Sequence, residues 1–371
     1  MRNFEQVKRI VIKIGTSTLS TDDGINRDYI QSLARQVAWL VKSGRQVLIV
    51  SSGAIGMGAK QLKIAGPVTD MELRQACAAT GQPLLMHAYH DAFSAVELTV
   101  SQVLVTAEVL DKRKTYLNLR NAIEGLLKLG TVPIINENDC VSTEEIGTAF
   151  GDNDKLSALV ASKIDADLLI MLTDIDALYD KDPRKHNDAK ALRQVQEITD
   201  EIIKAAGKKG SDYSTGGMKT KLAAAKIAST AGCRMVLANG SEPDVIQKIM
   251  EGEGIGTVFA ADTQILSNRI RWILHSKPEG TIHVDKGAIK AIGKRKSLLP
   301  SGITAVEGTF SAGAVVMINE VAKAVVSLNS DEINRVAGAH SGTIRDLLGA
   351  DRRDVVAVPE DIVFLDSEKN V

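Results

Sequence analysis

Hydrophobic and polar positions between residues 9 and 240 follow two alternating patterns. Short runs rich in β-branched residues predict strands that are buried on both faces, and longer amphipathic stretches between them predict helices. The predicted strands are RIVIKIG, RQVLIVSSG, LTVSQVLV, TVPIIN, DLLIMLTD and CRMVLANG, and the predicted helices cover 27–43, 69–95, 106–129, 152–164 and 217–231. This alternation is typical of βαβ units, so the sequence predicts an α/β fold around a mainly parallel sheet.

The rest of the chain has a different pattern. Residues 176–215, rich in Asp, Lys, Gly and Ser, are expected to form irregular surface structure. After residue 260, short apolar runs separated by glycines (GTIHV, AVEGTF, GAVVMIN, AKAVVSL) predict a small β-rich domain. We therefore expect a first domain over 1–274, a linker near 275–280 and a second domain over 281–357.

Composition excludes several classes of protein. With 44% hydrophobic and 25% charged residues, the chain is neither disordered nor fibrous. A net charge of -1 gives no overall attraction to nucleic acid or to an anionic membrane. Cys77, Cys140 and Cys233 lie far apart without a CxxC pair, which fits neither a disulfide framework nor a zinc site. No run reaches the roughly 18 apolar residues of a membrane span, so we expect a cytoplasmic protein.

Candidate binding groups follow the predicted strands, and in open α/β sheets ligands bind outside the carboxyl ends of the strands. Lys13, in VIKIGTS, is a candidate phosphate-binding residue or a strand lysine whose end reaches solvent. The turn SSGAIGMG, residues 51–58, offers backbone N–H groups to an anion or is simply a tight turn. Thr173-Asp174 suits a nucleotide contact or forms a plain turn.

Three further motifs combine polar residues more densely. The amides and carboxylates of NEND, residues 136–139, suit an ammonium group and the polar groups of a small substrate, or form an Asx turn with a helix cap. GDNDK, residues 151–155, opens a helix whose capping requires only one such residue. TGGMKTK, residues 215–221, places two lysines where they oppose a helix dipole, which favours a bound polyphosphate over a solvated helix face.

The chemistry of this set favours phosphoryl transfer. The sequence contains no GxSxG, HExxH or Cys/His cluster, so a hydrolase or zinc enzyme lacks its usual groups. Phosphoryl transfer depends mainly on positioning and on neutralising charge, which lysines and backbone N–H groups provide. A carboxylate acceptor is already ionised at neutral pH and needs no general base. The residues therefore fit a carboxylate kinase.

Taken together, the motifs resemble the glutamate 5-kinases of the amino acid kinase family. The resemblance rests on VIKIGTSTL, IVSSGAIGMG, PIINENDCV, GDNDKLSALVA, MLTDIDALYDKDPR and TGGMKTKLAAAKIA. GTIHVDKGA, SLLPSGI, NSDEI and GAHSGTI resemble the C-terminal PUA domain of many such kinases. The resemblance implies an αβα sandwich that phosphorylates the γ-carboxylate of L-glutamate with ATP and Mg²⁺, the first step of proline biosynthesis.

The resemblance also implies roles for individual residues. The catalytic residues are Lys13 and Lys221, which neutralise the transferred phosphoryl group, and Asp154, which orients them. The glutamate-binding residues are Ser52, Gly53, Ala54, Asn136, Asp139, Asp152 and Asn153. The ATP-binding residues are Lys13, Thr173, Asp174, Thr215, Gly216, Gly217, Met218, Lys219, Thr220 and Lys221, with Ser214 where the family usually has glycine. No side chain is assigned to a metal, because Mg²⁺ is expected mainly through the ATP phosphates.

Partners follow from the same resemblance. It implies a homo-oligomer, either dimer or tetramer, a functional link to glutamate 5-phosphate reductase, and proline as a feedback inhibitor acting near residues 139–150. The alternatives are a relative that acts on N-acetylglutamate, aspartate, carbamate or UMP, and an RNA-binding protein. Residues 281–357 contain ten Lys and Arg against eight Asp and Glu, a thin basis for binding a phosphate backbone, so neither RNA nor a membrane is expected as a partner.

Overall fold

The computed structural model describes most of the chain in two compact units. The described residues are 2–21, 24–141, 153–183, 185–205, 217–262, 266–340, 347–349 and 355–365. The first unit comprises Met1–Leu110 with Lys114–Leu266, and the second comprises Asp111–Arg113 with Ser267–Val371. The domain ranges that the sequence analysis gives, 1–274 and 281–357, stay predictions.

An eight-stranded sheet forms the centre of the first unit, in the order β10-β12-β11-β7-β1-β4-β6-β5. The six strands from β11 to β5 are parallel, while β12 runs antiparallel to β11. The strands are β1 (Arg9–Ile14), β4 (Gln46–Val50), β5 (Val100–Val105), β6 (Val132–Glu137), β7 (Leu168–Thr173), β10 (Gln194–Val195), β11 (Arg234–Asn239) and β12 (Thr257–Phe259). The predicted mainly parallel sheet is therefore confirmed, and the carboxyl ends of its central strands lie along one edge.

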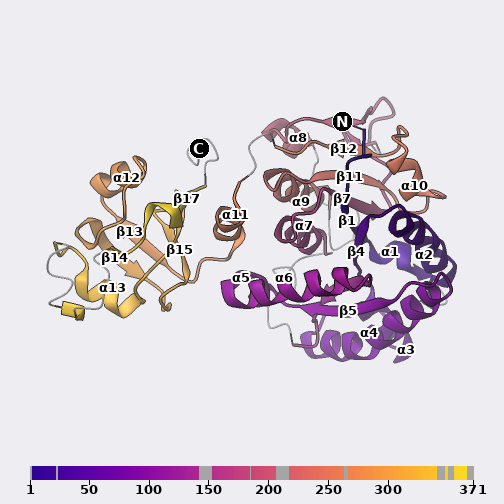
Figure 1. Ribbon diagram of the computed structural model, residues 1–371, viewed down its shortest axis with the longest axis horizontal. Helices are drawn as coiled ribbons and strands as arrows, with labels where there is room; N and C mark the ends of the chain where they lie inside the picture. The colour runs from indigo at the N-terminus through magenta and orange to yellow at the C-terminus, as the bar shows by residue number, and fades with distance from the viewer. Residues whose placement is uncertain are drawn as a thin grey trace. The chain divides into compact units, whose positions relative to one another are not determined.

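Alternate residues of the strands contribute to two separate hydrophobic cores. Ile10, Ile12 and Ile14 of β1 pack with helices on one face, and Val11 packs with helices on the other. The first face carries α2 (Arg27–Lys42), α4 (Met71–Ser94) and α10 (Val245–Met250), and the second carries α6 (Arg113–Lys128), α7 (Asp154–Lys163) and α9 (Met218–Thr230). Figure 1 shows α7 and α9 across the strands from α2 and from α1 (Thr16–Leu19). The expected αβα sandwich is confirmed.

Two expectations about local structure were wrong. The helix predicted over 106–129 is two helices, α5 (Ala107–Asp111) and α6, because the chain bends at Lys112. The segment 176–215, expected to be irregular, includes β8 (Leu178–Tyr179), β9 (Ala191–Leu192), β10 and α8 (Asp200–Ala205). Strands of two residues are too short to show a period in sequence, and pairing with distant segments creates them.

Helices α3 (Ala54–Gln61) and α4 pack closely because two glycines lie where they meet. A Cβ atom on Gly58 would lie 1.8 Å from the Cys77 carbonyl oxygen, and one on Gly81 would lie 1.8 Å from the Ala54 carbonyl oxygen. Helix α4 continues through Pro83, as the sequence predicts. This close approach fixes the first turn of α3 against the middle of α4.

The second unit contains a five-stranded sheet in the order β14-β13-β15-β16-β17. Its strands are β13 (Thr281–Val284), β14 (Ile303–Glu307), β15 (Val315–Ile318), β16 (Ala322–Val325) and β17 (Ile362–Phe364), and its helices are α11 (Asn268–His275), α12 (Lys286–Ile292) and α13 (Ser330–Val336). A hydrophobic core of its own, which includes Val316, Ala324 and Ile333, lies within this unit. The predicted β-rich character of this part of the chain is confirmed.

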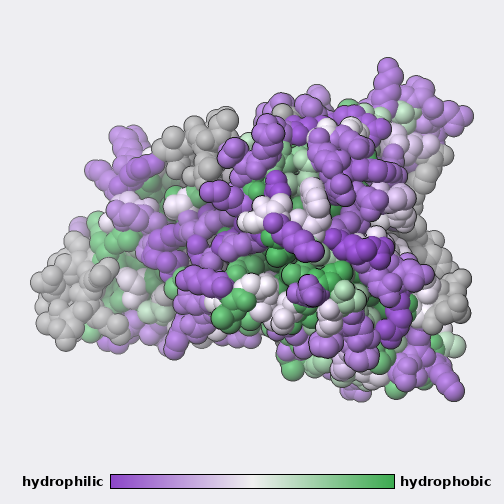
Figure 2. All heavy atoms as spheres, turned by 45° about the vertical axis from the view of Figure 1, so that its right-hand side comes forward, coloured by the Kyte–Doolittle hydropathy of each residue, from purple (hydrophilic) through white to green (hydrophobic). Residues whose placement is uncertain are grey.

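One face of the molecule is mainly hydrophilic. Figure 2 shows polar side chains over most of one face, with hydrophobic residues gathered in smaller areas. Among the described residues, no helix is both long and apolar enough to span a bilayer.

Candidate active site

Two lysines and one aspartate meet at the carboxyl edge of the sheet. Lys13 lies near the end of β1, Asp154 is the first residue of α7, and Lys221 is in the first turn of α9. The Lys13 Nζ lies 2.7 Å from Asp154 Oδ1, and the Lys221 Nζ lies 3.1 Å from Oδ2. Thr220 Oγ1 also donates to Oδ2, at 2.8 Å. The structure thus brings together the three residues to which the resemblance gave catalytic roles.

This cluster is buried and carries a net positive charge. The side chains of Lys13 and Asp154 are 0% exposed and that of Lys221 is 2% exposed. Burial alone raises the pKa of Asp154, but attraction to Lys13 and Lys221 outweighs burial and holds the pKa of this carboxyl below its usual value. Two ammonium groups against one carboxylate leave a buried charge of +1. An uncompensated buried charge is unfavourable, so the cluster is suited to an incoming anion.

A network of amide groups adjoins the cluster. Asn153 precedes Asp154 and caps α7 with φ 56°, but its side chain makes no capping hydrogen bond. Instead its Nδ2 donates to the Ser51 carbonyl oxygen at 2.6 Å and to Asn136 Oδ1 at 2.8 Å. The Asn136 Nδ2 in turn donates to Gln82 Oε1 at 2.8 Å. The side chains of Asn136 and Asn153 therefore link the end of β4, β6 and the start of α7.

The turn after β4 presents backbone groups at the same edge. Gly53, which caps α3, has φ +94°, a left-handed conformation that favours glycine. This conformation leads directly into α3, so the first N–H groups of the helix, beginning with Ala54, are available to an anion. Ser52 is 5% exposed, and its hydroxyl group finds no hydrogen-bond partner in the part of the chain that the structure describes. Such a group is available for a ligand.

Asp139 lies just beyond β6 and is half-buried. Burial raises the pKa of this carboxyl, and the Arg74 guanidinium lowers it by a smaller amount. A partly desolvated carboxylate gains from an ammonium partner. The position is therefore consistent with the predicted contact to the amino group of a substrate.

The predicted ATP-binding residues are divided between strand ends and a helix. Thr173 ends β7, and its hydroxyl group donates to Asp174 Oδ1 at 2.9 Å. Gly217 caps α9 without a side-chain hydrogen bond, Met218 begins the helix, and Lys219 is exposed in its first turn. Asp152, Ser214, Thr215 and Gly216, and most of the segment 139–150, lie outside the described residues.

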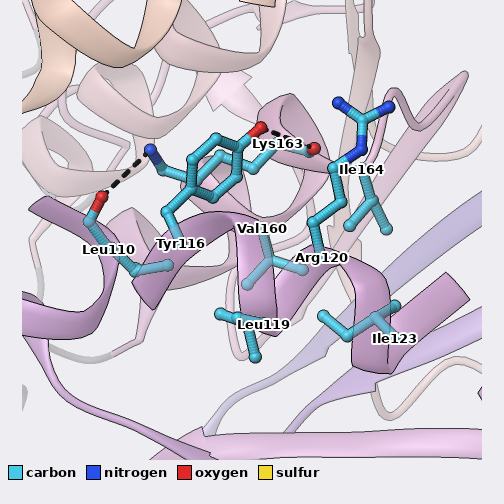
Figure 3. A pocket seen from close by; sticks show the side chains of 8 residues that line it. All are labelled: Leu110, Tyr116, Leu119, Arg120, Ile123, Val160, Lys163 and Ile164. Carbon is cyan, nitrogen blue, oxygen red and sulfur yellow. Dashed lines mark hydrogen bonds between the residues drawn. The ribbon is translucent and has the colours of Figure 1, made fainter. Parts of the chain in front are cut away.

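A cavity elsewhere in the first unit is too small for a substrate. Figure 3 shows it between α6 and α7, where Lys163 lies over the Tyr116 ring, with 4.3 Å between the Nζ and the ring centroid. Lys163 Nζ donates to the Leu110 carbonyl oxygen, and the Tyr116 hydroxyl donates to the Lys163 carbonyl oxygen, both at 3.2 Å. Its volume of about 10 Å³ matches a single water molecule. This cavity is therefore not a substrate site.

Among the described residues, the groups at this edge do not form a metal-binding cluster. Both carboxylate oxygens of Asp154 already contact cations or a hydroxyl group. Across the described ranges, no group of three His, Cys, Asp or Glu side chains is placed to hold a metal ion.

Comparison with known sequences identifies the family. The sequence profile of the amino acid kinase family matches residues 8–239, which include the lysine cluster and the amide network. The chain belongs to the amino acid kinase family. A PUA domain profile matches residues 280–348, in the second unit.

Individual relatives extend over nearly the whole chain. Glutamate 5-kinase of Methanosarcina mazei is 48% identical over an alignment of 375 positions, which covers 98% of this chain and 97% of its own. Glutamate 5-kinase of Geobacter sulfurreducens is 45% identical over 370 residues, or 98% and 99% of the two chains. The solved UMP kinase of Bacillus anthracis superimposes with a TM-score of 0.48 at 17% identity and covers 70% of this chain and 99% of its own. The predicted similarity of this amino acid kinase to the glutamate 5-kinases is confirmed.

The structure adds residues that the sequence patterns did not indicate. Helix α4 contributes Gln82 to the amide network, and the Tyr89 hydroxyl lies 3.0 Å from Ser51 Oγ. Both side chains belong to the middle of a helix, whereas the expected ligand groups follow strand ends. Gln82 and Tyr89 are seven residues apart, which places both on one face of α4. This spacing is the feature of the sequence that could have indicated that both side chains face the site.

Proposed function

We propose that this chain transfers the γ-phosphoryl group of ATP to the γ-carboxylate of L-glutamate and forms L-glutamyl 5-phosphate, the first step of proline biosynthesis. The observation that carries the proposal is the buried Lys13–Asp154–Lys221 cluster beside an amide network at the carboxyl edge of the sheet. Relatives named glutamate 5-kinase match over nearly the full chain and support the choice of substrate.

The reaction brings two anions together, and the buried lysines reduce their repulsion. An oxygen of the γ-carboxylate attacks the γ-phosphorus in line, and ADP leaves from the opposite side. At an effective dielectric constant of about 20 and a separation of about 4 Å, each pair of like unit charges costs roughly 4 kcal/mol. Lys13 and Lys221 neutralise this charge as it is redistributed, while Asp154 holds both ammonium groups in place. No general base is required.

Glutamate binds on the side of the amide network in this proposal. Asp139 receives the ammonium group of the substrate, while Ser52, Asn136 and Asn153 provide polar contacts, with Asp152 as a further predicted contact. The N–H groups at Gly53 and Ala54 lie at the start of α3 and face the γ-phosphate. The unpartnered Ser52 hydroxyl, in the part of the chain that the structure describes, supports this arrangement.

ATP binds between β7 and the start of α9. Thr173 and Asp174 contact the nucleoside, and the segment from Thr215 to Lys221, which includes Gly216, Gly217, Met218, Lys219 and Thr220, contacts the phosphates. Mg²⁺ bound to the ATP phosphates would neutralise part of their charge. Two observations support the binding of a polyphosphate at this end of α9. Lys219 is exposed, and a Cβ atom on Gly217 would meet no described atom within 4 Å, so a ligand can approach the backbone there.

A trapping experiment tests the proposal. Acyl phosphates react with hydroxylamine to give coloured hydroxamates, so the protein is incubated with MgATP, hydroxylamine and one of four acceptors: L-glutamate, L-aspartate, N-acetyl-L-glutamate or none. Signal with L-glutamate alone is the expected result. Signal with another acid would change the acceptor and keep the mechanism, and folded protein that gives no signal with any acid would contradict the proposal.

The remaining expectations about partners stay predictions. Inhibition by proline is tested by adding millimolar proline to the same assay, and a dimer or tetramer by light scattering. A functional link to glutamate 5-phosphate reductase rests on the resemblance alone. A cytoplasmic location rests on the cysteine usage and on the lack of an apolar run long enough for a membrane span.

A further inference from the structure

Within the residues that the structure describes, the amide network contains one buried polar group without a hydrogen-bond partner. Gln82 is 7% exposed, and its Nε2 finds no hydrogen-bond partner among the residues that the structure describes. A buried amide donor that makes no hydrogen bond destabilises the folded protein, so native proteins rarely contain one without a reason. Like the Ser52 hydroxyl, this group is available for a ligand.

The direction of the hydrogen bonds in the network shows that the group of Gln82 without a described partner is a donor. The Glu137 backbone N–H donates to Asn136 Oδ1 at 2.9 Å, and a backbone amide can only donate. Oδ1 is therefore the oxygen of Asn136, and its Nδ2 must donate to the other side, where it meets Gln82 at 2.8 Å. Gln82 thus presents its oxygen to Asn136. Its NH₂ group is the one left free.

The position of Gln82 indicates which part of a substrate it meets. The hydrogen bonds lead from Asn153, the neighbour of Asp154, through Asn136 to Gln82. Asp154 and the two lysines mark the place where the phosphoryl group is transferred. Gln82 lies at the far end of this series, next to Gly81, which packs against Ala54. The amino-acid end of glutamate, which carries an ammonium group and the α-carboxylate, is directed away from the reacting γ-carboxylate.

We infer that Gln82 binds the α-carboxylate of L-glutamate through its free NH₂ group and thereby selects an acceptor with a free α-carboxylate. The NH₂ group can only donate, so it contacts the α-carboxylate and not the ammonium group. The bond is charge-assisted, which makes it stronger than a bond to a neutral carboxamide. This inference rests on the proposed function and adds a specificity-determining residue to the same site.

The substitution Gln82→Glu distinguishes the role of the carbonyl oxygen of Gln82 from that of its NH₂ group. One carboxylate oxygen still accepts the hydrogen bond from Asn136, and the other replaces the NH₂ donor and repels the α-carboxylate. We expect KM for L-glutamate to rise at least about tenfold, because loss of a charge-assisted hydrogen bond typically weakens binding by about this factor. The values of kcat and of KM for ATP should change less than about threefold.

The α-amide of L-glutamate (L-isoglutamine) provides the decisive comparison. It has the same γ-carboxylate, so the hydroxamate assay detects both products, but its α-carboxamide can donate to the carboxylate introduced by Gln82→Glu. The ratio of kcat/KM for L-glutamate to that for the α-amide is expected to fall at least about tenfold in this variant. Gln61→Glu, the same change at an exposed position of α3, is the matched control and should leave the ratio unchanged.

The outcomes are distinguishable. A wild-type chain without activity on L-glutamate contradicts the proposed function before any variant is made. If the wild type is active and Gln82→Glu changes the ratio of kcat/KM for the two acceptors by less than about threefold, only the role of Gln82 is overturned. An equal loss of kcat/KM with both acceptors also overturns this role, because it indicates that Gln82 is structural. If thermal unfolding shows that Gln82→Glu does not fold, Gln82→Met removes the donor without adding charge; the same ratio must then fall, and an unchanged ratio overturns the inference.

Discussion

Replacement of Lys221 by methionine separates the catalytic role of the buried cluster from its structural role. Methionine has nearly the length of lysine and no charge. After the change, Asp154 keeps its ion pair with Lys13 at 2.7 Å and its hydrogen bond from Thr220 at 2.8 Å, so no buried charge loses its last partner. The net charge of the cluster falls from +1 to zero.

The expected magnitudes differ strongly between folding and catalysis. A volume-conserving change in a core typically alters the free energy of unfolding by less than about 1.5 kcal/mol. Loss of one unit charge about 4 Å from the transferred phosphoryl group removes roughly 4 kcal/mol of stabilisation at an effective dielectric constant of about 20, which corresponds to about a 1000-fold lower kcat. The variant should therefore fold and fail to turn over.

Two measurements on the same protein test this reasoning. Denaturant unfolding gives the stability, and hydroxamate formation from L-glutamate gives kcat. Lys226→Met, a change at an exposed lysine of the same helix, is the control and should keep wild-type activity. A Lys221→Met protein with kcat within about tenfold of wild type would refute the role of this lysine, and a loss of stability beyond about 3 kcal/mol would refute the charge argument.

Three further changes test other parts of the structure. Asp154→Asn removes the carboxylate that both Lys13 and Lys221 contact, so it should lower the free energy of unfolding by about 3–5 kcal/mol, measured with denaturant. MgATP should raise the thermal midpoint of this variant more than that of wild type. Burial raises the pKa of Asp139 above 3.8, so this residue becomes neutral as the pH falls through the raised pKa. In that pH range KM for L-glutamate should rise more steeply in wild type than in Asp139→Asn, which has no carboxylate to protonate. Gly81→Ala places a Cβ 1.8 Å from the Ala54 carbonyl oxygen and should lower the free energy of unfolding by about 1–3 kcal/mol, measured with denaturant. Gly125→Ala is the control and should not destabilise the protein, because its new Cβ meets no described atom within 4 Å.

The lowered pKa of Asp154 also fixes a pH dependence of folding stability. The pKa of this carboxyl is lower in the folded protein than the value of 3.8 for a free side chain. Its contribution to stability is therefore fully present above pH 3.8 and is lost as pH falls through the lower folded value. Because Asp154→Asn lacks this contribution at every pH, its acid unfolding should be shifted to higher pH.

The sequence by itself determined the layers of the first unit and the positions of its main strands. Runs such as IVIKI and LLIMLT are apolar at every second and nearly every intervening position, so both faces had to be covered, and helices lay between them in the chain. Strand ends then had to lie along one edge, which placed Lys13, Asn136 and Thr173 near one another. The short strands β10 and β12 had no such signal, because distant residues create them by pairing.

Only the tertiary structure decided how the polar side chains at that edge are used. A lysine at a strand end, a carboxylate that opens one helix and a lysine in the first turn of another each allow an ordinary surface role. Packing of α7 against α9 and β1 buries them together, and burial makes each depend on the others, because an ion in a low-dielectric interior requires a partner. In the same way, the close glycine packing between α3 and α4 brings Gln82 to Asn136, a meeting that depends on backbone approach across 54 residues of sequence and has no local pattern.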